Sequence, residues 1–493
     1  MIFNKILRTS AFAVLVFSSL GSAQEGPDEA ITADDGGPMD QVVPVADDDA
    51  AEEEPLAGPP PQTDISPKAE LLQLFEEYKR LMSEGTYDQA DTVAKSIVTL
   101  AIEITGPQSS ETAKALTNLG IVQHRNKEFD AAQQNFASAI DIIEDLEDRL
   151  NGKLINPLKG LGAAQLEAGR PDLAKQTFDR AVHITHVNDG PHNMGQIEIL
   201  ESLAETSVRL GSVEDAREMH DKIYMLHQRR YEDDQLALIP ALMRRAEWQH
   251  RAGYVMDEQA TYRRAIRIIE SNAGKKDLRL IDPLTKLGTS YFFSDLHGEQ
   301  AVYRSPVSGE IYFKRALKIA ESNPESNWMI AARSRIALGN YYMLQGLQTR
   351  ANKLYVEVWD GLASDESMLT LRDEVFSQAV PLNDRPLPDF AGDHNPSSIA
   401  NLDEEFEQGS VTMSYSVTAR GRVTELEPVE VYPPEFVDMQ RVVHRELRSR
   451  MYRPRFEEAE PVSSENRVFT HIFYYKQSDL DERREEALES DST

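Results

Sequence analysis

Three histidines are the first residues of this chain whose type could do chemistry, because imidazole nitrogens are common zinc ligands. They are His183, His186 and His192. They fall where a helix is expected to end and a loop to follow, and no motif of partnering carboxylates accompanies them. The chain has no cysteine, which removes thiolate metal sites, disulfides and attachment of a lipid through an N-terminal cysteine. We therefore expect loop histidines and no metal site.

Other signatures of catalysis are missing from the sequence. It has no glycine-rich phosphate loop, no G-x-S-x-G elbow and no H-E-x-x-H pair. Carboxylates are numerous because Asp and Glu total 83 against 52 Lys and Arg, a formal net charge of −31. This charge disfavours nucleic acid and anionic membrane surfaces as partners of the whole chain. We expect no enzyme and no cofactor; a hydrolase with an unfamiliar site stays open, and turnover by the pure protein would reveal it.

Residues 1–23 have the pattern of a secretory signal peptide. Lys5 and Arg8 give a positive start, residues 11–20 an apolar core, and Gly21-Ser22-Ala23 a small-residue cleavage site. The apolar run is shorter than the ~20 residues that span a bilayer. This favours cleavage near Ala23 over an uncleaved anchor, and it predicts a periplasmic protein with no lipid anchor.

Residues 24–67 form an acidic segment with 13 Asp and Glu and no Lys or Arg. Low hydrophobicity and uniform charge predict a disordered linker, since such a chain cannot bury enough apolar surface to offset its ordering entropy. It serves either as a spacer or as a docking segment.

A pattern of small residues recurs from residue 68 to residue 366. Leu119-Gly120 returns 42 residues later as Leu161-Gly162. The same register falls on Glu77-Tyr78, Leu203-Ala204, Arg245-Ala246, Leu287-Gly288 and, nine residues late, Leu338-Gly339. A fixed period of this length is typical of a helical solenoid, in which neighbouring units bury their apolar faces together.

Each unit of the repeat is expected to be a pair of helices. The first helix carries the small pair, a glycine turn follows, and the second helix carries Ala132, Phe136 and Ala139 or their equivalents. The small residues let two helices approach closely, and the ring fills the gap against the next unit. An insertion near residues 298–309 is either a surface loop or a binding lip.

These residues resemble the tetratricopeptide repeat, and the long period resembles the variety found in kinesin light chains. The resemblance implies a peptide-binding groove lined by the first helix of each pair. In that register the groove positions include His124, Arg125, Lys159, Arg209, His250, Arg251 and Asn340. The cations favour an acidic partner or a C-terminal carboxylate. Alternatively, they form exposed ion pairs within the array, with acids such as Glu205 and Glu247.

The hydrophobic period changes after a second expected linker at residues 367–405. Apolar side chains alternate from Val411 to Val417, Gly421 marks a turn and Val423 starts a partner strand. Pro433 and Pro434 then open an amphipathic helix, and a last strand runs to about Tyr475. The expected fold is an α solenoid followed by a small α+β domain of β-β-α-β order at residues 406–477, which folds alone from about Asn395. Residues 478–493 are expected to be a disordered acidic tail.

Residues 406–477 resemble the C-terminal domain of TonB. The resemblance is carried by the hairpin with its glycine turn, the helix, the motif Tyr452-Arg453-Pro454 and an aromatic-rich last strand. It implies that an edge strand pairs with a short peptide of an outer-membrane transporter or another envelope protein. The candidate edge residues are Arg467, Phe469, His471, Phe473 and Tyr475. The alternative is that this strand simply belongs to the core.

The chain departs from the TonB family at its start, because a cleavable signal replaces the membrane anchor. Our leading hypothesis is therefore a non-enzymatic periplasmic adaptor, whose repeats bind one protein and whose TonB-like domain binds another by strand addition. The alternative is a TonB-type energy transducer, which requires that residues 1–23 stay on the chain.

Overall fold

The computed structural model describes residues 66–231, 235–296, 309–383, 387–392 and 406–491. These residues form two compact units that divide at His227. We call residues 66–226 the N-terminal unit and the described residues from 227 to 491 the C-terminal unit. The expected signal peptide, the acidic segment up to residue 65 and residues 298–308 of the insertion lie outside the described residues.

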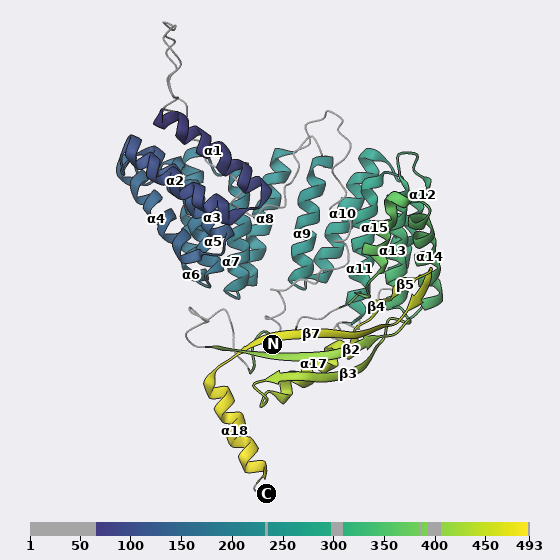
Figure 1. The fold of residues 1–493 in the computed structure, drawn as a ribbon. Coiled ribbons are helices and arrows are strands. Elements are labelled where there is room, and N and C mark those ends of the chain that lie inside the picture. The colour runs from purple at the N-terminus through teal and green to yellow at the C-terminus, as the bar shows by residue number, and fades with distance from the viewer. Residues whose placement is uncertain (1–65, 232–234, 297–308, 384–386, 393–405, 492–493) are drawn as a thin grey trace, which may run out of the picture. The chain divides into compact units, whose positions relative to one another are not determined.

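The N-terminal unit is a series of helical hairpins (Figure 1), in which each helix from α1 to α6 packs on the one that follows it. Short 3-10 turns at residues 152–154 and 194–196 precede two of the helices. The helices are α1 (Pro67–Glu84), α2 (Tyr87–Thr105), α3 (Ser110–Arg125), α4 (Phe129–Leu146), α5 (Ile155–Glu167), α6 (Pro171–Asp189), α7 (Ile197–Arg209) and α8 (Val213–Arg230), which runs past the division at 227. Repeated helical hairpins are what the period predicts.

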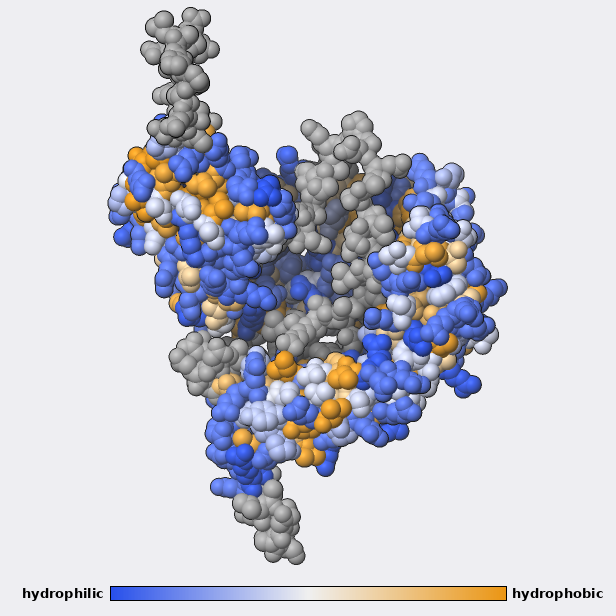
Figure 2. Space-filling view, viewed as in Figure 1, coloured by the Kyte–Doolittle hydropathy of each residue, from blue (hydrophilic) through white to orange (hydrophobic). Residues whose placement is uncertain are grey.

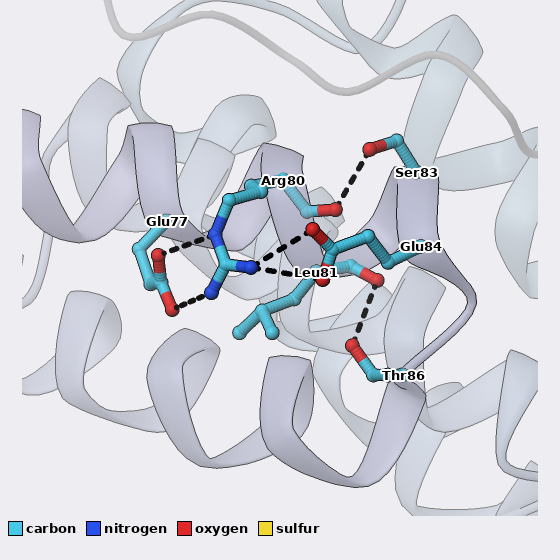
Figure 3. A network of polar contacts seen from close by, with 6 residues as sticks. All are labelled: Glu77, Arg80, Leu81, Ser83, Glu84 and Thr86. Atoms are coloured by element: carbon cyan, nitrogen blue, oxygen red, sulfur yellow. Dashed lines mark hydrogen bonds and ion pairs between the residues drawn. The ribbon is translucent and has the colours of Figure 1, made fainter.

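Helix α1 shows how burial, rather than surface charge, holds a helix in the array. Gly85 ends it with a φ of 72°, a left-handed conformation that glycine adopts without strain. On its exposed side Arg80 bridges Glu77 at 2.6 Å and Glu84 at 2.8 Å (Figure 3). Exposed ion pairs of this kind contribute little stability. Most of the stabilisation of α1 comes from its buried side chains, among them the fully buried Tyr78.

The glycines of the repeated small pair leave room for aromatic rings that pack directly on them, and we call each such contact a ring seat. A methyl group added at Gly120 would lie 2.8 Å from the Phe136 ring, and one added at Gly160 on α5 would lie 2.4 Å from it. Phe136 is therefore held between two glycines of successive hairpins. Gly162 receives Phe178 in the same way, at 2.7 Å. The seats recur in the C-terminal unit, with Gly288 under Phe313 and Gly339 under Tyr355.

The C-terminal unit begins with further helical hairpins. They contain α9 (Ile239–Arg251), α10 (Val255–Ala273), α11 (Ile281–Leu296), α12 (Glu310–Ser322), α13 (Trp328–Leu344), α14 (Gln348–Ala363) and the short α15 (Leu369–Phe376). Among the described helices of both units, none has the length and apolar character needed to cross a membrane.

A three-stranded antiparallel sheet follows in the same unit. Its strands lie in the order β3 (Val423–Tyr432), β2 (Glu407–Val417) and β7 (Ser464–Tyr475). Helix α17 (Val437–Ser449) packs on one face of the sheet through Met439, Val443 and Leu447. Short strands β1 (Val380–Pro381), β4 (Tyr452–Arg453), β5 (Arg455–Glu457) and β6 (Glu460–Val462) form two small ribbons, β1 with β4 and β5 with β6.

The range expected as a second linker is partly structured. Helix α15 and strand β1 both lie within residues 367–405. Farther along, Ala391 belongs to the core under the sheet, and Phe390 lies edge-on to Phe406 at 5.2 Å. The linker prediction is therefore wrong for these segments, because their apolar side chains are buried against elements that are remote in the sequence.

The expected disordered tail is also partly structured. Helix α18 runs from Gln477 to Asp491, and its Leu480 is buried under the sheet. Arg483 pairs with Asp438 at 2.7 Å and Arg484 pairs with Glu435 at 2.8 Å, which attaches α18 near the start of α17. Composition suggested disorder because the partners of Arg483 and Arg484 lie 45 and 49 residues away and leave no signal in the local sequence.

Candidate binding surfaces

The predicted groove cations of the N-terminal unit are occupied within the array. Lys159 is only 5% exposed and pairs with Glu198 of α7. Arg209 donates to the Leu166 carbonyl at 2.9 Å and to Glu167 at 2.8 Å, both on α5. These contacts join neighbouring hairpins, so the structure places both cations in the alternative role of internal ion pairs.

The other two groove residues of this unit end α3. His124 has both ring nitrogens buried without a hydrogen-bond partner, and its ring lies edge-on to Phe129 at 5.5 Å. Burial lowers the pKa of His124 below its ordinary value. A neutral imidazole adds no cation to a groove. Arg125, beside it, is half-buried.

The groove residues of the C-terminal unit are likewise engaged with their own array. His250 Nδ1 lies 3.1 Å from Oε2 of the buried Glu258 on α10. The hydrogen bond to Glu258 raises the pKa of His250 above its usual value, and burial raises the pKa of Glu258. The Asn340 side chain accepts a hydrogen bond from the Tyr355 hydroxyl at 2.9 Å. Arg251 is exposed at the end of α9.

The motif Tyr452-Arg453-Pro454 lies at a joint inside the C-terminal unit and is buried. The Tyr452 N–H donates to the Gly421 carbonyl at 2.9 Å. Arg453, 2% exposed, donates through Nη2 to the Val375 carbonyl of α15 at 2.9 Å and lies 5.7 Å from the Phe376 ring. The motif therefore ties the strand region to the last repeat helix and offers no exposed ligand site.

Aromatic rings from both sides of this joint share one core. Phe456 of β5 is 3% exposed. Its ring lies 5.2 Å from Phe376 of α15, 5.8 Å from Tyr355 of α14 and 6.3 Å from Trp359 of α14. The expectation of a C-terminal domain that folds alone disagrees with this shared core. Neither the period of the repeat nor the alternation of the strands could have revealed it.

Strand β7 is an edge strand of the sheet, but the main-chain groups of the residues predicted as its edge point toward β2 and not toward the open side. The Tyr474 N–H donates to the Asp389 carbonyl, and the Ala391 N–H donates to the Tyr474 carbonyl, each at 2.8 Å. The main-chain groups of Tyr474 thus point away from β2, and in an antiparallel ladder those of every second residue do the same. The outward-facing residues are therefore Val468, Thr470 and Ile472.

The named residues lie on the other side of the ladder. By the same alternation their main-chain groups face β2, and the side chains of Phe473 and Tyr475 are at most 1% exposed. His471 Nε2 lies 2.9 Å from the Pro388 carbonyl, while Phe469 is half-buried. Arg467 donates to the Ala379 carbonyl at 2.9 Å. Side-chain alternation in the sequence could have identified the inward face, but only the position of β2 decides which main-chain groups remain open.

An open window of main chain remains on β7. Within the described residues, Val468, Thr470 and Ile472 have no hydrogen-bond partner on the outer edge, while Tyr474 is covered by residues 389–391. Val468 is 64% exposed and Ile472 is 47% exposed. We call these three outward-facing residues the β7 window. A pocket of about 910 Å³ lies beside it, lined by α15, residues 377–381 and Arg467.

The opposite edge of the sheet is protected against strand pairing. Strand β3 contains Pro428, which has no N–H to donate, and Glu425, which has a φ of 50°. Its register with β2 shifts at two places. Proline, bulges and charged side chains are the usual means of blocking an edge strand. The β7 window has none of them.

The histidines considered for zinc are not brought together as a site. His186 Nε2 lies 2.7 Å from Gln196 Oε1 near the start of α7, and His183 and His192 are exposed. Across the residues that the structure describes, no group of three or more His, Asp or Glu could hold a metal ion.

Comparisons with known proteins identify the repeats. Residues 111–185, which cover most of α3 to α6, match the tetratricopeptide repeat family. This part of the chain is similar in sequence to the tetratricopeptide repeat, and it folds as helical hairpins. No curated protein matches the chain. The family match does not reach residues 406–477.

Solved structures of repeat proteins are similar to the chain at low identity. One is a putative kinesin light chain with nearly identical TPR-like repeats from Podosopora anserina, with 13% identity over 42% of this chain and 99% of that chain and a TM-score of 0.38. Another is the C-terminal part of a TPR repeat-containing protein from Cytophaga hutchinsonii, with 8% identity over 60% and 98% and a TM-score of 0.35. A Rap protein complexed with competence and sporulation factor has 12% identity over 62% and 94% and a TM-score of 0.28. Such loose superpositions add nothing on function.

Proposed function

We propose that this protein is a non-enzymatic adaptor of the periplasm, whose repeat array holds one protein and whose sheet region, resembling the TonB C-terminal domain, holds an extended segment of another. The repeats support the first half, because tetratricopeptide-like hairpins are a binding scaffold. The pattern of residues 1–23 supports export. Partners of the sheet region would be an outer-membrane transporter or another envelope protein.

The β7 window carries the second half of the proposal. Three residues present unpaired main-chain groups on one edge, next to exposed β-branched side chains. An added strand would satisfy the N–H and carbonyl groups of Val468, Thr470 and Ile472, and its side chains would extend the exposed face. The protected edge at β3 directs such a strand to β7 rather than to the other side of the sheet.

Site-specific photocrosslinking tests this mode of binding. A photoreactive residue replaces Val468 in the full chain, and the matched control replaces Val429 of β3, which is 62% exposed against 64% for Val468. We expect crosslinks to an envelope protein at 468 and none at 429. A second variant adds Thr470→Pro, which removes an outward N–H and leaves the ladder to β2 intact. If crosslinking at 468 persists in that variant, strand addition is not the mode of binding.

The intact mass of the protein recovered from producing cells tests the location and separates the two envelope roles. A mass that corresponds to a chain beginning at Gln24, in protein from the periplasmic fraction, supports the adaptor. A mass that retains Met1, from the membrane fraction, supports the TonB-type transducer instead. The mass therefore decides whether energy transduction needs to be considered at all.

A further inference from the structure

Helix α17 carries a stripe of arginines on its outer side. Arg441, Arg445 and Arg448 are all exposed, and their spacing of four and then three residues places them on one side of a helix. The apolar residues of α17 lie on the other side, in the core under the sheet. At 1.5 Å per residue the three arginines extend over about 10 Å along the helix. We call these three residues the α17 stripe.

Three carboxylates on or next to this helix have cationic partners. Asp438 pairs with Arg483 at 2.7 Å, and Glu435 pairs with Arg484 at 2.8 Å, both through α18. Glu446 is buried and lies 3.8 Å from Arg450. Two arginines of α18 thus neutralise the acids that could have served the stripe.

The stripe itself has no such partner. Among the residues that the structure describes, no ion pair, hydrogen bond or ring contact involves the side chain of Arg441, Arg445 or Arg448. Three adjacent cations without counter-charges stand out in a chain of net charge −31. Since the groove cations Lys159 and Arg209 are engaged inside the array, the stripe is the better place for the acidic partner that the sequence suggests.

We propose that the α17 stripe binds a carboxylate-rich segment of a partner protein. Guanidinium groups form bidentate, charge-assisted hydrogen bonds with carboxylates, which a row of three arginines can offer to acids spaced along one segment. This surface is distinct from the β7 window, and the inference holds whether or not the window accepts a strand.

The surroundings of the stripe favour a protein segment over a membrane. The one exposed apolar side chain on this side of α17 is Val437, at 43%, so the helix has no apolar face left to enter a bilayer. A planar anionic membrane would also bring its charge up to the rest of an acidic chain. A short segment meets only the stripe, because more distant acids are screened beyond about 8 Å at physiological salt.

Fluorescence anisotropy with a labelled oligoglutamate peptide tests the proposal on the full chain. The stripe variant is Arg441→Gln, Arg445→Gln and Arg448→Gln together. The matched control is Arg229→Gln, Arg230→Gln and Arg267→Gln, three exposed arginines of α8 and α10. Both variants change the net charge equally. Thermal melts establish that both keep their fold.

We expect oligoglutamate to bind at physiological salt, about tenfold more weakly in the stripe variant and with little change in the control. Equal losses in both variants would mean that only net charge matters, and would overturn the proposal. So would an absence of binding by the wild-type chain. Flotation with phosphatidylglycerol vesicles is the third arm: binding of vesicles but not of oligoglutamate would make the stripe a membrane contact and overturn the proposal as well.

Discussion

Replacing Phe456 by alanine should destabilise the last repeat helix, α15, although Phe456 and α15 are remote in the sequence. The ring is 3% exposed and meets Phe376, Tyr355 and Trp359 at centroid distances of 5.2, 5.8 and 6.3 Å. Removing a buried phenylalanine ring costs about 3–5 kcal/mol in transfer and cavity terms. With a urea dependence of about 2–3 kcal/mol per M, the unfolding midpoint of the C-terminal unit should fall by roughly 1.5 M.

Hydrogen exchange of the full chain shows where the loss is felt. Peptides from α15, residues 369–376, and from β4 and β5, residues 452–457, should both lose protection in Phe456→Ala. The control Ile472→Ala, at a side chain that is 47% exposed, should change neither. If α15 exchanges as in the wild type while β4 and β5 open, the repeats and the sheet do not share one core, and our reasoning about the joint fails.

Three further predictions test other parts of the structure. Gly162→Ala should destabilise the N-terminal unit by about 1–3 kcal/mol through overpacking, because the added methyl would lie 2.7 Å from the Phe178 ring; an unchanged urea midpoint would contradict the ring seat. The C-terminal unit should lose stability as pH rises above about 6.5, since the contact between His250 and Glu258 raises the pKa of His250 and burial raises that of Glu258. Stability from both groups is present at lower pH and is lost as each deprotonates. His250→Gln should therefore weaken the dependence of the urea midpoint on pH between pH 6 and 8, and an unaltered dependence would exclude this pair as its cause. A fragment of residues 395–493 should show no cooperative unfolding by circular dichroism, because it lacks α15 and residues 387–391; a sharp transition would restore the independent domain.

The repeated architecture could be predicted from the sequence because it depends on local spacing. A period of 42 residues and the recurrence of small pairs and rings require helical hairpins that stack. The packing of Phe136 on Gly120 agrees with the same spacing, since a ring needs the room that glycine leaves, whereas its second neighbour Gly160 was found only in the structure. Likewise, the alternation from Val411 to Val417 predicts a strand wherever the rest of the chain lies.

The state of the charged side chains depended on contacts that no local pattern contains. The register gave the positions of Lys159 and Arg209, but their partners Glu198 and Glu167 lie 39 and 42 residues away on neighbouring hairpins. The spacing of Arg441, Arg445 and Arg448 was equally plain in the sequence. That they stay unpaired was decided by α18, whose arginines occupy the nearby acids.

The sequence by itself determined the periodic elements, because side-chain spacing encodes which face of a helix or strand is apolar. The tertiary structure alone decided which groups remain available. The side of β7 on which β2 pairs left Val468, Thr470 and Ile472 open. The packing of Arg453 and Phe456 on α15 turned a family motif and an expected linker into one buried joint. Burial and pairing depend on neighbours brought together by the fold, and such neighbours leave no local signal in the chain.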